Sequence, residues 1–147
     1  MSELQLPQAE ADNLIAMEKH RQDERAWNAP GPGKKVSIPL VSADRRENFL
    51  FDLRKGRLRL SQATYQTRAR LVICLIRLDL DGPGHRNPDG EEIDCPHLHL
   101  YREGYGDKWA QPIPDNFRDP TDFWVTLEDF FSYSGVTQAP FVRRELF

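Results

Sequence analysis

The chain has 147 residues, which is enough for one domain with a hydrophobic core of its own. Hydrophobic residues make up 39% and charged residues 29% of the sequence, a composition that suits a soluble globular protein. The formal net charge of -3 gives the whole chain no general attraction to nucleic acid or to an anionic membrane. The two cysteines, Cys74 and Cys95, are too few for a disulfide framework.

The sequence shows no sign of export or of membrane insertion. Residues 1–13 have neither the basic start nor the apolar segment of a signal peptide. A run of about 18 apolar residues, which a membrane-spanning helix needs, does not occur. We therefore expect a cytoplasmic protein that makes no membrane contact and forms a single domain over residues 1–147.

Residues 1–34 predict a helix followed by a linker. Residues 8–27 contain no proline or glycine and many good helix formers, but few large apolar side chains. We therefore expect a peripheral helix over 8–27. Two prolines and two glycines then predict a linker at 28–35.

Residues 36–103 predict an antiparallel sheet. Five runs in this part of the chain have the alternation or the composition of strands, at 36–41, 47–53, 58–67, 70–80 and 97–103. Pro39 cannot donate to a strand ladder, which predicts that the first run is an edge strand. The sequence NPDG at 87–90 predicts a β-turn within the loop 81–94.

Residues 119–135 predict a C-terminal helix. Its apolar residues recur on one face, at Phe123, Trp124, Leu127, Phe130 and Phe131. Such a stripe needs a sheet to lie on. The sequence thus predicts an α+β fold, with a four- to five-stranded antiparallel meander and an N-terminal and a C-terminal helix packed on one face.

The segment CPHLHLYREGYGDKW at 95–109 carries the most distinctive polar pattern. Side chains alternate between the two faces of a strand, so Leu98 and Leu100 share one face. The opposite face then carries four polar or amphipathic residues, His97, His99, Tyr101 and Glu103.

The run 70–80 shows the same alternation in its second half, where Arg77, Asp79 and Asp81 alternate with apolar residues. If this run pairs antiparallel with 97–103, the polar residues of both runs share one face. We expect a register that places Asp79 opposite His99, within reach of a cross-strand contact.

A carboxylate beside a histidine suits acid–base chemistry near neutral pH. The first hypothesis is therefore a metal-independent ribonuclease of the toxin type, without a cofactor. Its catalytic residues would be His97 and His99 as base and acid, Asp79 as the orienting carboxylate, and Tyr101 beside them. Further side chains would bind the substrate, namely Arg77, Lys108, Arg57, Arg59 and His85.

The basic segment 45–70 is the reason to consider RNA. It holds eight Lys and Arg residues against Glu47 and Asp52, a net charge of +6 in an acidic protein. A basic stretch is most often a solvated sheet face, and nucleic-acid binding is the second interpretation.

Three other interpretations of the polar strand face stay open. Two histidines on a strand most often only form hydrogen bonds. The face could bind a protein partner without catalysis, as in an antitoxin or an inhibitor of a phage-defence system. His97, His99 and Glu103 could also bind a metal. We expect no stoichiometric metal, because a fourth ligand is not convincingly placed.

Three stretches, FLFDLRKGRLRLSQATYQTRAR, LIRLDLDGPGHRNPDGEEI and PHLHLYREGYGDKWA, together resemble an uncharacterised bacterial family of small single-domain proteins. The resemblance covers roughly residues 36–133. It implies a bacterial or phage protein encoded by a free-standing small gene. It brings no established activity, so it adds no catalytic residues to those reasoned from the sequence.

Overall fold

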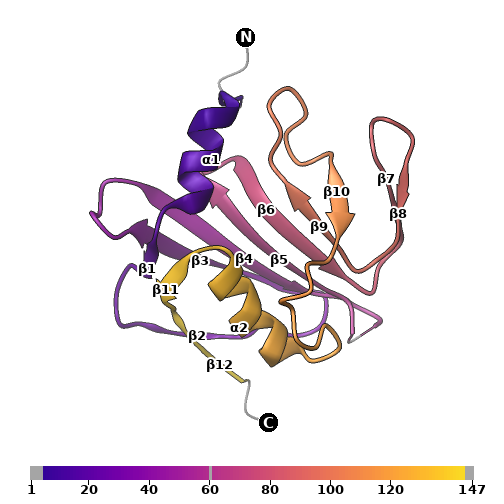
Figure 1. Cartoon of the computed structure of the whole chain (residues 1–147). Coiled ribbons are helices and arrows are strands. Elements are labelled where there is room, and N and C mark those ends of the chain that lie inside the picture. Colours follow the sequence, from indigo (N-terminus) through magenta and orange to yellow (C-terminus); the bar gives the residue numbers. More distant parts are fainter. Residues whose placement is uncertain (1–4, 60, 145–147) are drawn as a thin grey trace.

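A large sheet with both helices on one side forms the framework of the computed structural model, which describes residues 5–59 and 61–144 (Figure 1). The helices are α1 (Gln8–Ala16) and α2 (Phe123–Tyr133). Residues 1–4 of the N-terminal stretch, and residue 60 of the strand expected at 58–67, lie outside the described part. The α+β class expected from the sequence is confirmed.

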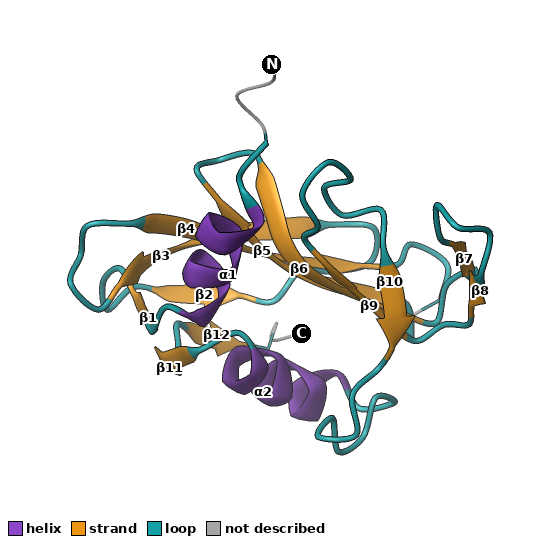
Figure 2. Ribbon diagram, turned by 45° about the horizontal axis from the view of Figure 1, so that its top comes forward, coloured by secondary structure: helices purple, strands orange, loops and turns teal. Residues whose placement is uncertain are grey.

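Twelve strands accompany the two helices in the described chain: β1 (Lys19–Arg21), β2 (Ala26–Asn28), β3 (Lys35–Ser42), β4 (Asn48–Lys55), β5 (Ala63–Ala69), β6 (Ile73–Leu80), β7 (His85–Arg86), β8 (Glu92–Ile93), β9 (His97–Leu100), β10 (Ala110–Pro112), β11 (Val136–Gln138) and β12 (Phe141–Arg143). Eight of them form the main sheet, in the order β10-β9-β6-β5-β4-β3-β1-β11. Its neighbours are antiparallel except for the β1–β11 pair. The small pairs β2–β12 and β7–β8 lie outside this sheet (Figure 2).

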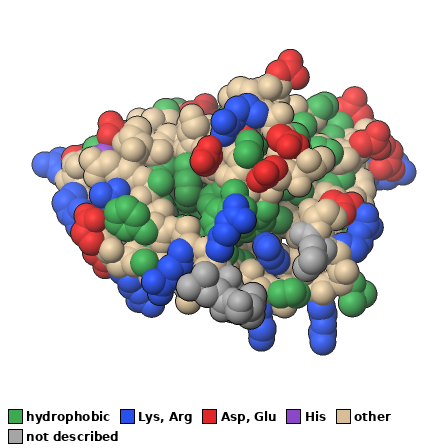
Figure 3. Space-filling view, turned by 90° about the horizontal axis from the view of Figure 1, so that it is seen from below, with side chains coloured by type: hydrophobic (Ala, Val, Ile, Leu, Met, Phe, Trp, Pro, Cys, Tyr) green, Lys and Arg blue, Asp and Glu red, His purple; other side chains and the backbone are tan. Residues whose placement is uncertain are grey.

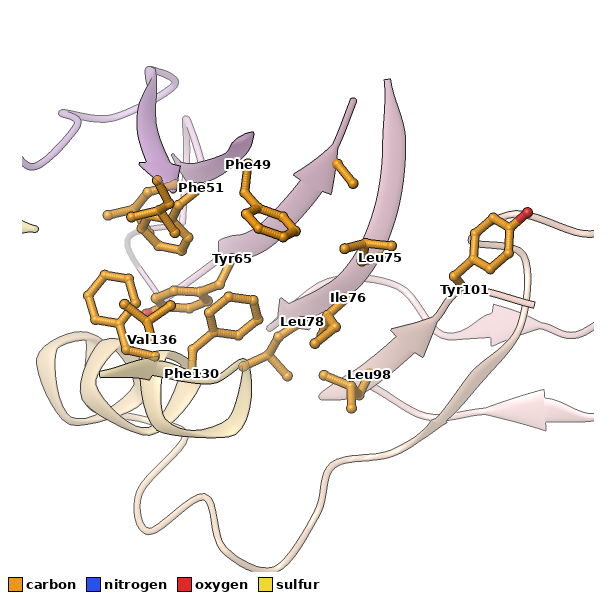
Figure 4. Close-up of a cluster of buried hydrophobic side chains, with 14 of the residues drawn as sticks. Phe49, Phe51, Tyr65, Leu75, Ile76, Leu78, Leu98, Tyr101, Phe130 and Val136 are labelled. Carbon is orange, nitrogen blue, oxygen red and sulfur yellow. The ribbon is translucent and has the colours of Figure 1, made fainter. Parts of the chain in front are cut away.

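The hydrophobic core lies between the sheet and the helices (Figure 4). Alternate residues of the central strands point into it, and α2 adds Phe130 and Phe131. The ring of Phe51 on β4 has its centroid 5.7 Å from that of Phe130 and 4.8 Å from that of Phe131. The aromatic stripe of the C-terminal helix therefore packs on the sheet, as the sequence predicts.

Basic side chains contact the first turn of α2. Seen from below, hydrophobic atoms gather in the middle of the surface, with Lys and Arg and some Asp and Glu side chains around them (Figure 3). The ammonium of Lys55 lies 4.5 Å from the ring centroid of Phe123, and the guanidinium of Arg144 lies 5.0 Å from that of Trp124. These cation–π contacts shield rings that the sheet leaves partly exposed.

The sheet is wider than the four or five strands expected, because short strands extend it at both ends. β10 adds to one edge, and β1 and β11 add to the other. Pro39 accordingly lies on an interior strand, which corrects the prediction of an edge strand. The neighbouring β1 pairs only with Leu40–Ser42 of β3. The ladder therefore ends just before Pro39, which has no backbone N–H to donate.

The helix expected over 8–27 ends at Ala16, and this prediction was wrong beyond that residue. The cause is a long-range contact rather than the local sequence. The backbone N–H of Lys19 donates to the carbonyl of Gly135, and β1 inserts between β3 and β11. Pairing on both sides satisfies the backbone that the helix would otherwise have satisfied.

The side chain of Lys19 is fully buried and joins the ends of both helices. Its ammonium donates to the carbonyls of Ile15, Met17 and Ser134 at 2.9–3.0 Å. Burial lowers the pKa of Lys19 to about 8, so the amine is still mostly protonated at pH 7. Three N–H groups then match three carbonyls, and the positive charge lies where the helix dipoles favour it.

No described helix has the length and apolar composition needed to span a membrane.

Replacing Lys19 by methionine should test this anchor. Lys19→Met keeps an unbranched side chain but leaves buried carbonyls without a donor, so we expect the free energy of unfolding to fall by about 2–4 kcal/mol. Urea unfolding followed by circular dichroism measures the loss. Lys34→Met, at an exposed lysine, is the control and should change stability by less than about 0.5 kcal/mol. Equal effects of the two changes would contradict the anchoring role.

Candidate functional site

The face of the sheet opposite to the helices carries two parallel rows of polar side chains. Strand registers place the first row across β3, β4, β5, β6 and β9, at Lys35, Arg54, Thr64, Asp79 and His97. The second row lies beside it on the same strands, at Ser37, Asp52, Gln66, Arg77 and His99. The pairing of β6 with β9, which are not consecutive in the chain, thus brings Arg77 and Asp79 beside His97 and His99.

The register between β6 and β9 differs from the one expected. Asp79 lies opposite His97, and Arg77 lies opposite His99. The expected pairing of Asp79 with His99 is therefore off by two residues. A shift of two preserves the facing of every side chain, so the shared polar face forms nevertheless.

Asp79 is the centre of the cluster. Its Oδ2 atom lies 3.2 Å from Nε2 of His97 and 3.3 Å from Nε2 of His99. Its Oδ1 atom accepts a hydrogen bond from the hydroxyl of Thr64 at 3.2 Å. One ligand atom from each of Asp79, His97 and His99 lies within 4.8 Å of the others.

Hydrogen bonds to backbone carbonyls orient both imidazole rings. Nδ1 of His97 lies 3.3 Å from the carbonyl oxygen of Asp94, and Nδ1 of His99 lies 2.7 Å from that of Asp107. The two carbonyls and the carboxylate of Asp79 can all only accept, so a neutral ring donates either through Nδ1 to its carbonyl or through Nε2 to Asp79. When the hydrogen is on Nδ1, the lone pair on Nε2 of that ring faces Asp79.

Burial and charge hold these groups in defined protonation states. His97 and His99 are only 3% and 1% exposed. Burial, together with the neighbouring His99, lowers the pKa of His97 further than its contacts with Asp79 and with the carbonyl of Asp94 raise it, which favours the neutral ring. Burial by itself raises the pKa of Asp79, but the hydrogen bond with His99 and the charge of Arg77 lower it to about 2. The cluster therefore combines an ionised carboxylate with a neutral imidazole at neutral pH.

Arg77 lies at the side of the cluster, where it was expected as a substrate-binding residue. Its guanidinium contacts Nε2 of His99 at 3.0 Å and Oδ2 of Asp79 at 3.3 Å, and it also pairs with the carboxylate of Asp107 at 2.5 Å. Sequence reasoning missed Asp107, whose carbonyl orients one ring and whose carboxylate holds the arginine. Its position in the glycine-containing loop after β9 was the only signal.

His85 approaches from the β7–β8 hairpin. The centroid of its ring lies 4.7 Å from that of His99 and 5.9 Å from that of His97. Its Nε2 atom lies 2.7 Å from the carbonyl oxygen of Lys108. Lys108 thus contributes its backbone carbonyl to the contact with His85, while its side chain is exposed.

Tyr101 does not join the histidines, and the expected shared face was wrong for this residue. Its hydroxyl donates to the carbonyl of Leu6 at 2.9 Å and accepts from the N–H of Leu6 at 2.7 Å. β9 ends at Leu100, and β6 has an irregularity near Leu75 that turns Leu75 into the core. The N–H of Tyr101 donates to the carbonyl of Leu75, and its ring follows Leu75 into the core (Figure 4).

Glu103 is exposed and accepts a hydrogen bond from the N–H of Gln8, so it lies outside the cluster. The alternative metal set with Glu103 is corrected, because Asp79 is the carboxylate beside the histidines. Arg57 and Arg59 lie in the exposed connection between β4 and β5, where Arg59 pairs with Asp81. Arg59 was expected in the strand at 58–67 and lies in this connection instead.

A shallow pocket of about 280 Å³ opens over the cluster. Arg77, Asp79 and the three histidines line it, together with residues 82–84 of the following loop. A larger pocket of about 710 Å³ lies between α1 and the β9–β10 region, where Tyr101 and Trp109 are among its lining residues. The smaller pocket is the candidate site, since the histidine cluster is at its floor.

Comparison with known proteins identifies the chain at the level of a family. A family model matches residues 6–136. The chain belongs to DUF6978, a family of unknown function. The resemblance to an uncharacterised family is thereby confirmed. No curated protein and no solved structure matches the chain.

The same face of this DUF6978 protein holds a second carboxylate, Asp52, in a closed network. Its oxygens accept from the hydroxyl of Ser37 at 2.6 Å, the amide of Gln66 at 2.7 Å and the guanidinium of Arg68 at 2.6 and 2.9 Å. Burial raises the pKa of Asp52, but the bonds with Arg68, Ser37 and Gln66 outweigh it, so the net direction is downward. Asp52 therefore stabilises the sheet beside the candidate site.

The Asp52 network should make stability depend on pH. Asp52→Asn leaves Arg68 without its anion, and we expect a loss of about 2–3 kcal/mol at pH 7, since Arg68 is partly solvated. The folded-state pKa lies below the unfolded value of about 3.9. The wild-type advantage should therefore be complete above that pH and shrink as the pH falls through the lower folded value. Unfolding free energies of both proteins between pH 3 and 7 measure this. Asp115→Asn, at an exposed site, should show no such difference.

Proposed function

We propose that this protein binds a divalent transition-metal ion, such as zinc, through Oδ2 of Asp79 and Nε2 of His97 and His99. The observation that carries the proposal is the convergence of these three atoms, all within 4.8 Å of one another, on the polar sheet face. Two histidines and one carboxylate are a common ligand set for zinc and for iron(II).

The orientation of the two rings supports a metal more than an acid–base pair. Each ring places Nδ1 against a backbone carbonyl, which is how metal-binding histidines are commonly fixed. Both Nε2 atoms then point at the same carboxylate oxygen. A general acid and a general base would instead each have to reach a different proton of the substrate.

The protonation states support the same proposal. A metal requires neutral imidazole and ionised carboxylate. The pKa of Asp79 is lowered to about 2, and that of His97 is lowered from its ordinary value. Both directions favour the ligand form. A lowered pKa also makes His97 a poor choice for the general acid.

Three protein ligands leave room for a water molecule or a substrate on the metal, as in catalytic zinc sites. The pocket of about 280 Å³ supplies the space. Arg77 contacts two of the ligands and also Asp107, so it can keep its partner Asp107 when a metal takes its place beside His99.

Metal-independent cleavage of RNA is the second candidate function. Its specific support is the guanidinium of Arg77, 26% exposed, beside His99 and Asp79. In this mechanism Arg77 would bind the phosphate, and His97 and His99 would move the protons.

Metal binding should depend on the cluster alone. We expect the chelator-treated protein to bind about one equivalent of zinc in isothermal titration calorimetry. Asp79→Asn, His97→Ala and His99→Ala should each weaken binding by about 100-fold or more, because loss of an outer-shell partner alone costs about 10–100-fold. His20→Ala and Glu103→Gln are the controls, since both residues lie outside the cluster, and should bind as the wild type does. Equal binding by all five variants would contradict the proposed site.

Cleavage of single-stranded RNA separates the two candidates. For the metal centre, we expect any hydrolysis by the zinc-loaded protein to stop in EDTA and to return with zinc. Cleavage that persists in EDTA with a bell-shaped pH profile, and that falls by about 10²–10⁴ in His97→Ala and His99→Ala, would favour the second candidate.

A further inference from the structure

A polar groove extends from the histidine cluster across the sheet. A second shallow pocket, of about 300 Å³, adjoins the one over the histidines, and the two share Thr64, Arg77 and Asp79. Its far end is lined by Lys35 and Arg54, the first two members of the polar row. The groove therefore runs from two cations on β3 and β4 to the proposed metal site on β6 and β9.

The two cations lie in an arrangement that folding alone disfavours. Lys35 and Arg54 are direct cross-strand partners on the same face, and like charges at such positions repel each other. Within residues 5–59 and 61–144, neither of them forms a salt bridge. An anion bound between them would remove the repulsion.

The carboxylates of the groove do not compensate this charge. The carboxylate of Asp52 accepts two hydrogen bonds from the guanidinium of Arg68 and one each from Ser37 and Gln66. Asp79 already faces the two histidines and Arg77. With a divalent ion on the cluster, the whole groove would present cationic groups at both ends.

Strand spacing gives the size of a ligand that could use both ends. Neighbouring strands lie about 4.8 Å apart, so Arg54 on β4 and Lys35 on β3 are about 10 and 15 Å from Asp79 on β6. The residues between them, Thr64 and Gln66, are polar. This lining suits an anion with several charges and hydrogen-bond acceptors rather than an apolar ligand.

We propose that the groove binds phosphate esters, with Lys35 and Arg54 on one phosphate and Arg77 holding a phosphate at the metal. Arginine and lysine are the usual phosphate-binding side chains. The proposal deepens the proposed function and rests on it, because it names the substrate class of the metal centre. A nucleotide phosphomonoester and the phosphodiester backbone of a nucleic-acid strand share this chemistry.

The test uses a fluorescein-labelled single-stranded RNA hexamer and inorganic phosphate, with the full chain and its matched variants. Lys35→Met/Arg54→Met removes the two groove cations. Arg45→Met/Arg46→Met is the control, because it removes two exposed cations from the β3–β4 connection. Its net charge is the same as that of the groove variant. Binding is followed by fluorescence anisotropy over a range of salt concentrations, in the presence of zinc. The same measurement is made with the metal-site variant Asp79→Asn.

We expect the groove variant to bind RNA at least about tenfold more weakly and to lower the salt slope by about 0.7, the contribution of the one phosphate that the two cations share. The control should bind as the wild type does, and inorganic phosphate should compete. Weak RNA binding with strong binding of adenosine monophosphate would identify a phosphomonoester as the source. Equal effects of the two double variants, or no binding of any phosphate probe, would overturn the proposal.

The two proposals fail in different ways. Dependence of phosphate binding on Lys35 and Arg54, without any zinc binding, would support the groove and reject the metal centre. Zinc binding that needs Asp79, with phosphate binding unchanged in the groove variant, would keep the metal centre and reject the groove.

Discussion

The pairing of β6 with β9 determines both the core and the candidate site. Leu78 lies opposite Leu98, and both side chains are fully buried between the sheet and the helices. A slip of one residue would turn these leucines outward and force Asp79 and His97 into the core. The hydrophobic pair therefore fixes the register, and the register places the carboxylate beside both imidazoles. Burial of leucine thus sets the geometry of the polar cluster on the opposite face.

The sequence predicted the facing of these residues but not their partners. Alternation along 97–100 and 77–80 was enough to assign the histidines and Asp79 to one face, because the strand period is two. The loop 81–94 is too long to define a register, so the expected partner of Asp79 was two residues away from the observed one. The proposed carboxylate ligand was misassigned to Glu103 for a related reason. Sequence reasoning looked along one strand, whereas the ligand comes from its neighbour.

Other differences arise where long-range contacts override local preference. Residues 17–27 are good helix formers, yet the helix ends at Ala16. Residues 19–21 form β1 instead, because they pair with β3 and β11 and because Lys19 is buried at the ends of both helices. Strands of three residues, such as β1 and β10, carry too few side chains to show a period. Tyr101 follows the alternation in sequence, but the irregularity of β6 near Leu75 turns its ring into the core.

The contrast between Asp52 and Asp79 explains why the candidate site lies at one end of the polar face. The partners of Asp52 are hydroxyl, amide and guanidinium groups, which can only donate to it, and they occupy both of its oxygens. Asp52 is thus a closed structural ion pair. Oδ2 of Asp79 instead faces two imidazole nitrogens, each of which carries a lone pair when the hydrogen of the neutral ring is on Nδ1. Lone pairs facing a carboxylate repel it unless a cation lies between them. Arg77 supplies part of that charge from the side, and a metal ion would supply it from the centre.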